Sequence, residues 1–227
     1  MSNNHDKIEL TNFQKQVIIG TLLGDSTIRY VNPGTKNPNL TFSHSEKQIE
    51  YGHYKFDILK DIMSSWTDQD RMTNYGQFKR RMFTGKNCKV LKRFREAFYP
   101  KGIKVLNIPY LLKVFTEVSL CFLFMDDGCK SGNTIHLNLQ NFELSELEDF
   151  VHLLKWKFDL DFTIKKDKTL YLRQKSFDKF VDLIKPWLHP TMYYKITASC
   201  LKTPLNGETP KNGQSRAKLS ANTLINA

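Results

Sequence analysis

The 227-residue sequence contains little of the chemistry that usually organises a small metalloprotein or a secreted domain. It has no CxxC pair, which disfavours a zinc ribbon or a disulfide framework and fits a reducing compartment best. Its six histidines form no HNH-like cluster, and no GIY motif is present, so two common nuclease classes are disfavoured. The four scattered cysteines are Cys88, Cys121, Cys129 and Cys200.

Targeting and membrane signals are also missing. The first residues, MSNNHDKIELTNFQ, contain no apolar h-region and no Arg-rich amphipathic stretch. The apolar runs are too short to span a bilayer, and neither an amphipathic basic helix nor a lipidation motif is visible. We therefore expect no membrane partner. We expect a location in a bacterial cytoplasm, or in a mitochondrion or chloroplast that makes the protein itself.

Acidic residues are in the minority. The 23 Asp and Glu residues face 34 Lys and Arg, which leaves a formal net charge of +11. This basic bias indicates a polyanionic partner, and nucleic acid is the leading one. An anionic membrane surface is the weaker alternative, since no membrane-binding segment is visible.

What the sequence does contain is a repeated motif. The segments IIGTLLGDS (18–26) and LCFLFMDDG (120–128) are both apolar, helix-like runs that end in an acidic residue and a small residue. Asp127 follows Asp25 by 102 residues. Each run is long enough for a buried helix, so its terminal carboxylate should lie in or beside the core. The repeat favours two halves of about 100 residues each.

Both halves are expected to follow the order helix, strand, strand, helix, strand, strand, helix. Residues 1–103 form the N-terminal half, 104–202 the C-terminal half and 203–227 a polar tail without periodicity. Capping-box spacings start helices near Thr11 and Ser145. The expected elements of the first half are a helix over 12–25, strands over 27–31 and 40–44, a helix over 47–63, a strand over 77–83 and a helix over 86–98. Those of the second half are a helix over 117–127, a strand over 135–140, a helix from 145, strands over 162–165 and 169–174, and a helix over 177–184.

Two acidic helix ends at one place would repel each other. A helix C-terminus carries partial negative charge, so an Asp there is disfavoured by about 0.3–1 kcal/mol before the second carboxylate is considered. A divalent cation removes this conflict. Oxygen ligands without a His or Cys cluster favour Mg²⁺, with Mn²⁺ as an acceptable substitute. Gly20 and Gly24 have the spacing that permits close helix contact. One such motif alone is more often an ordinary core helix with a chance acidic end.

The two motifs resemble those of the LAGLIDADG homing endonucleases, in their single-chain form with two motifs. The likeness covers roughly residues 12–196 and extends to LNLQNF and LIKPWLHPTMYYK in the second half. The last Asp of each motif matches Asp25 and Asp127. The neighbouring positions hold Gly24 and Asp126 before them and Ser26 and Gly128 after them, and the sequence departs from the family pattern at Leu23, Ser26 and Phe122.

The resemblance implies an α+β fold with two pseudo-symmetric αββαββα repeats, each with a four-stranded antiparallel sheet, which together form a DNA-binding saddle. It implies a monomeric, Mg²⁺-dependent endodeoxyribonuclease that makes double-strand breaks at a long, non-palindromic DNA site in the service of intron mobility. The implied metal ligands are the carboxylates of Asp25 and Asp127 and the carbonyl oxygens of Gly24 and Asp126. The implied basic catalytic positions are Lys195 and Lys104, with Lys101 as a competitor for the latter.

The polar faces of the strands are expected to enter the major groove, which admits a β-ribbon. Candidate water-positioning groups are His44, Glu46, Gln140 and Asn141, which more simply contact only DNA or solvent. The candidate DNA-binding residues are Arg29, Lys36, Ser43, Ser45, Lys79, Arg81, His136, Asn138, Gln140, Lys165, Lys166, Tyr171, Arg173 and Lys175.

Two other functions stay open on the sequence alone. The first is an RNA-binding maturase of the same family that helps its intron fold, with or without cleavage activity. The second is a DNA-binding regulator that uses the fold without catalysis. The intact Asp25 and Asp127 favour the enzyme over both alternatives.

Overall fold

The computed structural model describes residues 8–73 and 76–197, and the predicted tail lies outside these ranges. The first half comprises α1 (Asn12–Leu23), β1 (Thr27–Arg29), β2 (Asn39–Ser45), α2 (Ile49–Ile58), β3 (Met63–Thr73), β4 (Gly76–Gly85) and α3 (Lys92–Phe98). The second half comprises α4 (Ile108–Val114), α5 (Glu117–Asp127), β5 (Gly128–Ser131), β6 (Thr134–Leu137), α6 (Leu144–Phe158), β7 (Phe162–Ile164), β8 (Leu170–Leu172), α7 (Phe177–Ile184) and α8 (Tyr194–Thr197). The boundary between the halves at residue 103 stays a prediction.

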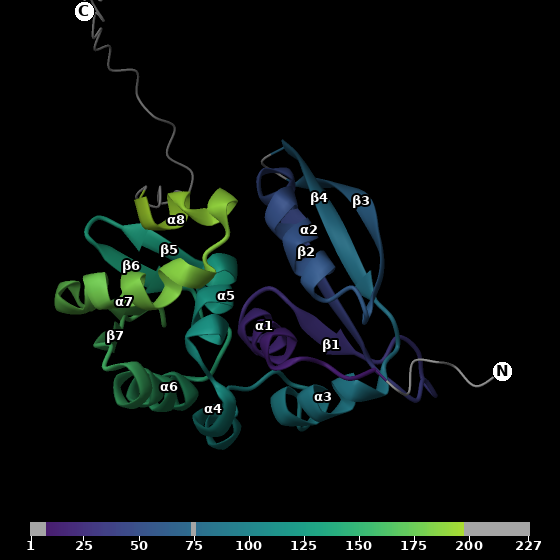
Figure 1. Cartoon of the computed structure of the whole chain (residues 1–227), viewed down its shortest axis with the longest axis horizontal. Helices are drawn as coiled ribbons and strands as arrows, with labels where there is room; N and C mark the ends of the chain where they lie inside the picture. Colours follow the sequence, from purple (N-terminus) through teal and green to yellow (C-terminus); the bar gives the residue numbers. More distant parts are fainter. Residues whose placement is uncertain (1–7, 74–75, 198–227) are drawn as a thin grey trace, which may run out of the picture.

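Two antiparallel sheets with the same topology flank a central helix pair (Figure 1). The first sheet has the strand order β1-β2-β4-β3 and the second has the order β5-β6-β8-β7. Buried side chains align across the inner strands, as in the pairing of Phe42 with Phe83 and of Leu137 with Leu170. The predicted fold class, an α+β chain with two equivalent four-stranded sheets, is confirmed.

Helices α1 and α5 pack against each other at the centre of the molecule (Figure 1). Helix α1 begins at the predicted capping box, in which the Gln14 amide donates to the Thr11 hydroxyl and the Thr11 amide donates to the Gln14 side chain. Both helices are buried on nearly all sides, because they lie at the centre of the molecule between the two halves (Figure 1). A Cβ at Gly20 would lie 2.4 Å from the Ser119 carbonyl oxygen, and one at Gly24 would lie 2.6 Å from the Asp126 Cβ. The glycine spacing therefore permits a direct backbone contact between the helices.

Several local predictions were wrong, each for an identifiable reason. Strand β3 was missed because most of its side chains up to residue 70 are exposed, so it shows no apolar alternation. The helix expected over 47–63 ends at Ile58, and its C-terminal residues belong to a turn and to β3. The capping box of α6 is formed by Glu143 and Glu146 rather than by the expected serine.

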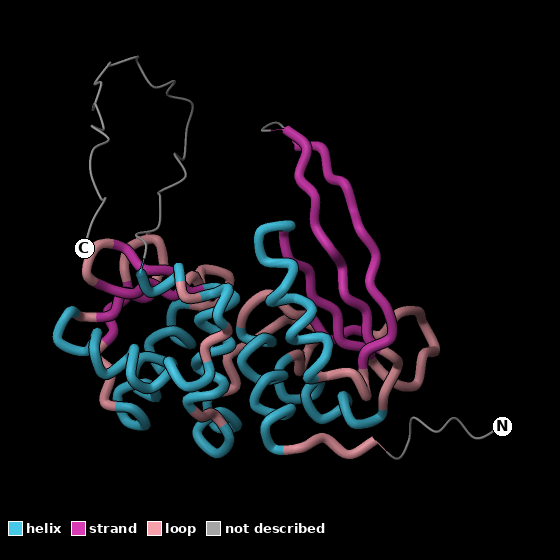
Figure 2. Tube along the Cα trace, turned by 45° about the horizontal axis from the view of Figure 1, so that its top comes forward, coloured by secondary structure: helices cyan, strands magenta, loops and turns pink. Residues whose placement is uncertain are grey.

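The two sheets differ in length although they share a topology. Strands β3 and β4 have 11 and 10 residues, whereas β7 and β8 have 3 residues each. The β3–β4 hairpin extends well beyond the helices of its own half (Figure 2). The pseudo-symmetry therefore holds for the central helices and the strand order but not for the lengths of the β3–β4 and β7–β8 hairpins.

Two further observations concern membranes and cysteines. Within 8–73 and 76–197, no helix combines the length and apolarity that a membrane crossing requires. Cys88 and Cys121 are buried free thiols, whereas Cys129 is disulfide-bonded. The sequence pattern gave no indication of that bond.

The helix contact can be tested by a Gly20→Ala substitution. Alanine is the better helix former by about 1 kcal/mol, but its methyl group would collide with the Ser119 carbonyl, which belongs to the backbone and cannot rotate away. We expect the free energy of unfolding to fall by about 1–2 kcal/mol in urea denaturation. Lys15→Ala, on an outer position of the same helix, is the control. A Gly20→Ala protein as stable as the control would contradict the close contact.

Candidate active site

The two predicted catalytic carboxylates stand at the ends of the paired helices. Gly24 caps α1 and is followed by Asp25, which is exposed, whereas Asp127 is the last residue of α5 and is half-buried. The structure thus brings to one place two acids that are 102 residues apart in the sequence. This is the juxtaposition that the repeated motif predicted.

Burial and mutual repulsion make both acids harder to ionise. Burial raises the pKa of Asp127 from 3.8 to about 7, and the negative charges of Asp25 and Asp126 add to the rise. Burial, followed by Asp126, also raises the pKa of Asp25. Asp25 keeps one side open to solvent, so the stronger effect is at Asp127. A pair of carboxylates in this state is a good ligand set for a hard divalent cation, which would relieve the repulsion.

Each helix end also receives one lysine from elsewhere in the chain. Lys104 Nζ donates to the Gly24 carbonyl at 2.8 Å and to the Ser26 carbonyl at 3.3 Å. Lys195 Nζ donates to the Met125 carbonyl at 2.6 Å and to the Asp126 carbonyl at 3.0 Å. Neither α1 nor α5, both fully described, carries a basic residue in its last turn, so these lysines supply the positive charge that a helix C-terminus favours.

The two lysines occupy equivalent places in the two halves. The carbonyl before Asp25 accepts from Lys104, and the carbonyl before Asp127 accepts from Lys195. Lys101, the competing residue in the sequence, is exposed, so the geometry favours Lys104. The same two carbonyls were predicted as metal ligands. Since a cation and an ammonium group would compete for them, that part of the metal prediction stays a prediction.

A buried polar cluster below the helix ends was missed by the sequence analysis. The side chains of Lys55 and Asp126 are both fully buried, and Lys55 Nζ lies 2.8 Å from Asp126 Oδ1. Burial by itself would raise the pKa of Asp126. The Lys55 ammonium and a hydrogen bond from Thr21 instead hold that pKa below its ordinary value. Tyr51 and Lys55 are four residues apart on the buried face of α2, and this spacing was the available signal.

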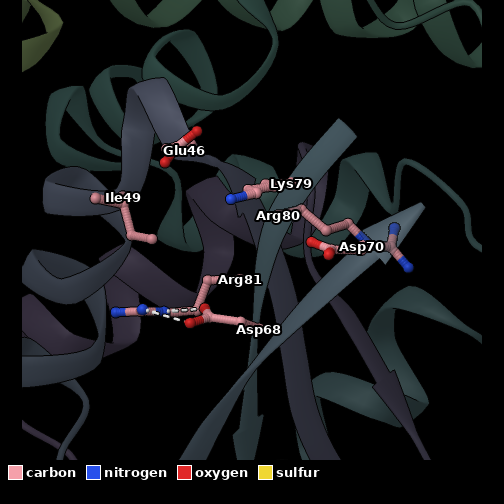
Figure 3. Close-up of a pocket in the computed structure, with 7 residues that line it drawn as sticks. All are labelled: Glu46, Ile49, Asp68, Asp70, Lys79, Arg80 and Arg81. Atoms are coloured by element: carbon pink, nitrogen blue, oxygen red, sulfur yellow. Dashed lines mark hydrogen bonds and ion pairs between the residues drawn. The ribbon is translucent and has the colours of Figure 1, made fainter. Parts of the chain in front are cut away.

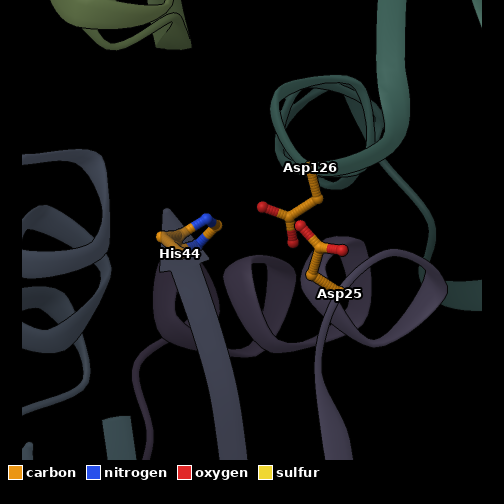
Figure 4. A group of neighbouring side chains, drawn as sticks. All are labelled: Asp25, His44 and Asp126. Atoms are coloured by element: carbon orange, nitrogen blue, oxygen red, sulfur yellow. The ribbon is translucent and has the colours of Figure 1, made fainter. Parts of the chain in front are cut away.

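His44 lies beside this cluster on β2 (Figure 4). One side-chain ligand atom from each of His44, Asp25 and Asp126 falls within 4.8 Å of the others. Burial, followed by the charge of Lys55, lowers the pKa of His44 to about 3, so its imidazole is neutral. Gln48 lies near the ring, yet within the described ranges neither ring nitrogen reaches a partner with hydrogen-bonding geometry. His44 is therefore a buried side chain rather than an outward-facing one.

The structure describes all of the predicted DNA-contacting residues of the second half, and that they contact DNA stays a prediction. Ile135 and Leu137 point into the core, so the alternate residue His136 faces the open side of the sheet, where its ring is 5.1 Å from that of Tyr171. Lys165 Nζ lies 4.4 Å from the centre of the Tyr171 ring on the same side. Three residues make contacts within the protein: Asn138 donates to the Asp127 carbonyl, Gln140 donates to Thr169 and Lys175 pairs with Asp161. Lys166 and Arg173 are exposed.

In the first half, one assignment to the open face was wrong. Lys79 and Arg81 alternate with Phe83 on β4, so they point to the side of the sheet that α2 covers. Arg81 Nε and Nη2 donate to Asp68 (Figure 3). Arg81 Nη1 also contacts His53 Nε2 on α2. Both candidates were misplaced because β4 has an apolar residue on each side, Met82 on one and Phe83 on the other, so its sequence does not show which side faces α2. Whether they contact DNA stays a prediction.

The open face of the first sheet carries other residues. Arg80, which the sequence analysis did not select, lies on it opposite Ser45. Ser43 lies on the same face, as predicted, and Arg29 and Lys36 are exposed near β1. The open faces of both sheets thus carry basic and hydroxyl side chains.

The paired acidic helix ends, each with its lysine, and the two equivalent sheets define a two-motif endonuclease of the LAGLIDADG type. The model of the LAGLIDADG DNA endonuclease family matches residues 15–180, and the chain belongs to this family. The protein is therefore a DNA endonuclease of the homing class, which confirms the class of enzyme implied by the resemblance.

Individual relatives agree with this assignment. Intron-encoded endonuclease ai4 of Dictyostelium discoideum is 35% identical over 124 residues, which cover 52% of this chain and 78% of the relative. Cytochrome b mRNA maturase bI2 of Debaryomyces hansenii is 25% identical over 193 residues, which cover 80% of this chain and 72% of the relative. The solved structure of the homing endonuclease I-WcaI bound to its DNA recognition sequence matches with a TM-score of 0.76 and 25% identity, covering 83% of this chain and 88% of that chain.

The raised pKa of Asp127 predicts a pH dependence of stability. Between its ordinary pKa of 3.8 and about 7, the folded protein keeps a proton that the unfolded chain has released. The resulting stability is full below pH 3.8 and is lost as the pH rises through about 7. In EDTA, we expect wild-type protein to lose about 1–2 kcal/mol more than Asp127→Asn between about pH 5 and pH 8. Thermal unfolding measures this, with Asp149→Asn on the exposed side of α6 as control. Parallel pH profiles for wild type and Asp127→Asn would contradict the shifted pKa.

Proposed function

We propose that the chain makes metal-dependent double-strand breaks at a long, asymmetric DNA site and so serves the mobility of an intron. The proposal rests on one observation above all, the meeting of Asp25 and Asp127 at adjacent helix ends with raised pKa values. The names of the intron-encoded relative and of the DNA-bound structural neighbour support it.

Asp25 and Asp127 would hold the divalent metal, for which we propose Mg²⁺ with Mn²⁺ as a substitute. When bound, such an ion polarises the scissile phosphate and activates water for attack. The protein's part is to present two carboxylates from rigid helix ends, so that little reorganisation is needed when DNA arrives. Oxygen donors on both sides of the helix pair suit a hard cation.

Lys104 and Lys195 would each serve one strand of the target. Burial lowers the pKa of both lysines, while the neighbouring acids oppose that change. Each ammonium is anchored on main-chain carbonyls at a helix end. An ammonium group held in this way can stabilise the charge that develops on a phosphate oxygen.

The unequal hairpins would make the two half-sites unequal. At about 3.3 Å per residue, β3 and β4 extend over about 33–36 Å, whereas β7 and β8 extend over about 10 Å. A duplex rises about 3.4 Å per base pair, so the first sheet can follow the groove over about ten base pairs. The basic residue Arg80 stands on the open face of that longer sheet.

Replacing either catalytic acid tests the proposed chemistry. A DNA target is first selected from a randomised duplex library incubated with wild-type protein and Mg²⁺, with EDTA as the negative arm. We expect Asp25→Asn and Asp127→Asn to slow cleavage of that target by about a hundredfold or more, because a metal ligand is lost. Binding of the same DNA should remain within about threefold, since the reading surface is unchanged.

The matched control is Asp149→Asn, which removes an exposed carboxylate from α6. Its cleavage rate should equal that of the wild type. An Asp25→Asn or Asp127→Asn protein that cuts at the wild-type rate would remove that residue from the active site. Failure of wild-type protein to cut any library member with a divalent metal would overturn the proposed function.

The half-site asymmetry can be measured by hydroxyl-radical footprinting of the bound target. We expect protection to reach several base pairs further from the cleavage site on one side, because only one hairpin is long. Arg80→Ala should weaken binding about fivefold or more and reduce protection on the longer side only. Arg93→Ala, an exposed arginine on α3, is the control. A symmetric footprint, or equal effects of the two substitutions, would contradict the assignment.

Intron RNA is a second candidate partner, because one relative is named as an mRNA maturase. A maturase role predicts that Asp127→Asn binds RNA of the host intron more tightly than an unrelated RNA of equal length. Equal affinity for both RNAs would contradict the maturase role and leave DNA as the specific partner of the basic surface.

A further inference from the structure

A fully buried ion pair joins the two halves of the molecule directly below the catalytic acids. Its members are Lys55 of α2 in the first half and Asp126 of α5 in the second half, with Nζ and Oδ1 separated by 2.8 Å. Asp126 immediately precedes Asp127, as Gly24 immediately precedes Asp25. The equivalent position of the first helix therefore has no side chain that could form a reciprocal pair.

The Asp126 carboxylate belongs to the second half of the chain and is surrounded by hydrogen-bond donors of the first half. Among the described residues, the hydrogen bonds it accepts come from Thr21 Oγ1 at 2.5 Å, Tyr51 OH at 2.9 Å and Lys55 Nζ at 2.8 and 3.1 Å. All three donors belong to the first half. A Cβ at Gly24 would lie 2.6 Å from the Asp126 Cβ, so the glycine leaves the space that the Asp126 side chain requires.

Lys55 is fixed as firmly as its partner. Its ammonium group donates to both Asp126 oxygens and to Thr21 Oγ1. The same nitrogen lies 4.5 Å from the centre of the Phe42 ring and 4.9 Å from that of the Tyr51 ring. These contacts surround the ammonium with hydrogen-bond acceptors and aromatic rings of the same cluster.

The ion pair argues against a separate metal site at Asp25, His44 and Asp126. A cation placed among these three side chains would face the Lys55 ammonium, which already neutralises the Asp126 carboxylate. Figure 4 shows the three side chains converging from β2, from the turn after α1 and from α5. The cluster is better explained as a connection between elements than as a binding site.

A buried ion pair is seldom retained for stability, because desolvation cancels most of the attraction and apolar residues of the same shape do as well. Its better-attested use is to fix the register of two packed elements. Here the packed elements are α5 on one side and α1 with α2 on the other. Asp127, the residue after Asp126, is one of the proposed catalytic acids. An error of about 1 Å in such a placement can slow a reaction about a hundredfold.

We propose that Lys55 and Asp126 are positioning residues that set the spacing of Asp127 against Asp25 and thereby the metal affinity of the site. The proposal rests on the proposed function, in which those two acids hold the metal.

The test uses four variants of the full chain: Lys55→Met, Asp126→Asn, the double variant and Tyr51→Phe. Each of the first two leaves one buried partner without its counterpart, and we expect the midpoint of thermal unfolding to fall by about 6 °C or more. The double variant replaces both charges by neutral groups of similar shape, so most of this loss should be recovered. Lys60→Met, an exposed lysine two residues beyond α2, is the control.

The decisive readout is single-turnover cleavage of the library-selected duplex, already bound to protein, at increasing Mg²⁺ concentrations. For the double variant we expect cleavage to be slowed about tenfold or more and the Mg²⁺ midpoint to rise about threefold or more, with DNA affinity unchanged. Tyr51→Phe, which leaves both charges in place, should show the same changes to a smaller degree. A double variant that cuts at the wild-type rate with the wild-type Mg²⁺ midpoint would overturn the proposal. If the double variant does not fold, the same result for Tyr51→Phe would overturn it.

A crystal structure of the double variant supplies a readout that does not require cleavage. We expect α5 to shift relative to α1 by about 0.5 Å or more at Asp127. An unchanged helix pair would overturn the positioning role even if wild-type protein cuts no DNA. Failure of wild-type cleavage, by contrast, counts against the proposed function alone.

Discussion

The close contact of α1 with α5 is the constraint on which the rest of the structure depends. Gly20 and Gly24 allow the backbones of the two helices to touch, and any larger side chain would meet Ser119 or Asp126. Because the helices end side by side, their terminal acids meet, and each sheet is placed on its own side of the pair (Figure 1). The placement of the two sheets and the assembly of the site thus have one cause.

The same contact creates an electrostatic problem that the surrounding residues solve in part. Two helix ends and three acids, Asp25, Asp126 and Asp127, concentrate negative charge in one region. Lys55 neutralises Asp126, while Lys104 and Lys195 bind the main-chain carbonyls of the helix ends. Asp25 and Asp127 are left with raised pKa values, which is the condition that a divalent cation would relieve.

The sequence predicted the parts of the molecule that depend on local pattern and missed those that depend on distant partners. The repeated motif was enough to place α1, α5 and their terminal acids, and the boundaries of α7 were predicted without error. Strand β3 was missed because an exposed outer strand needs no apolar alternation. Lys55 was missed because its partner lies 71 residues away, and its four-residue spacing from Tyr51 indicates a buried position at most, not the identity of that partner. Lys79 and Arg81 were misplaced because β4 has apolar residues on both of its sides, so the sequence does not show which side is buried.

In the proposed mechanism, Asp25 and Asp127 hold divalent metal together at the junction of the helix ends. Anomalous diffraction from a crystal of the enzyme bound to its selected duplex in Mn²⁺ tests this metal site. We expect strong anomalous peaks in contact with both carboxylates and with the scissile phosphates. Peaks confined to other acidic groups, with the two side chains turned away from the DNA, would contradict it.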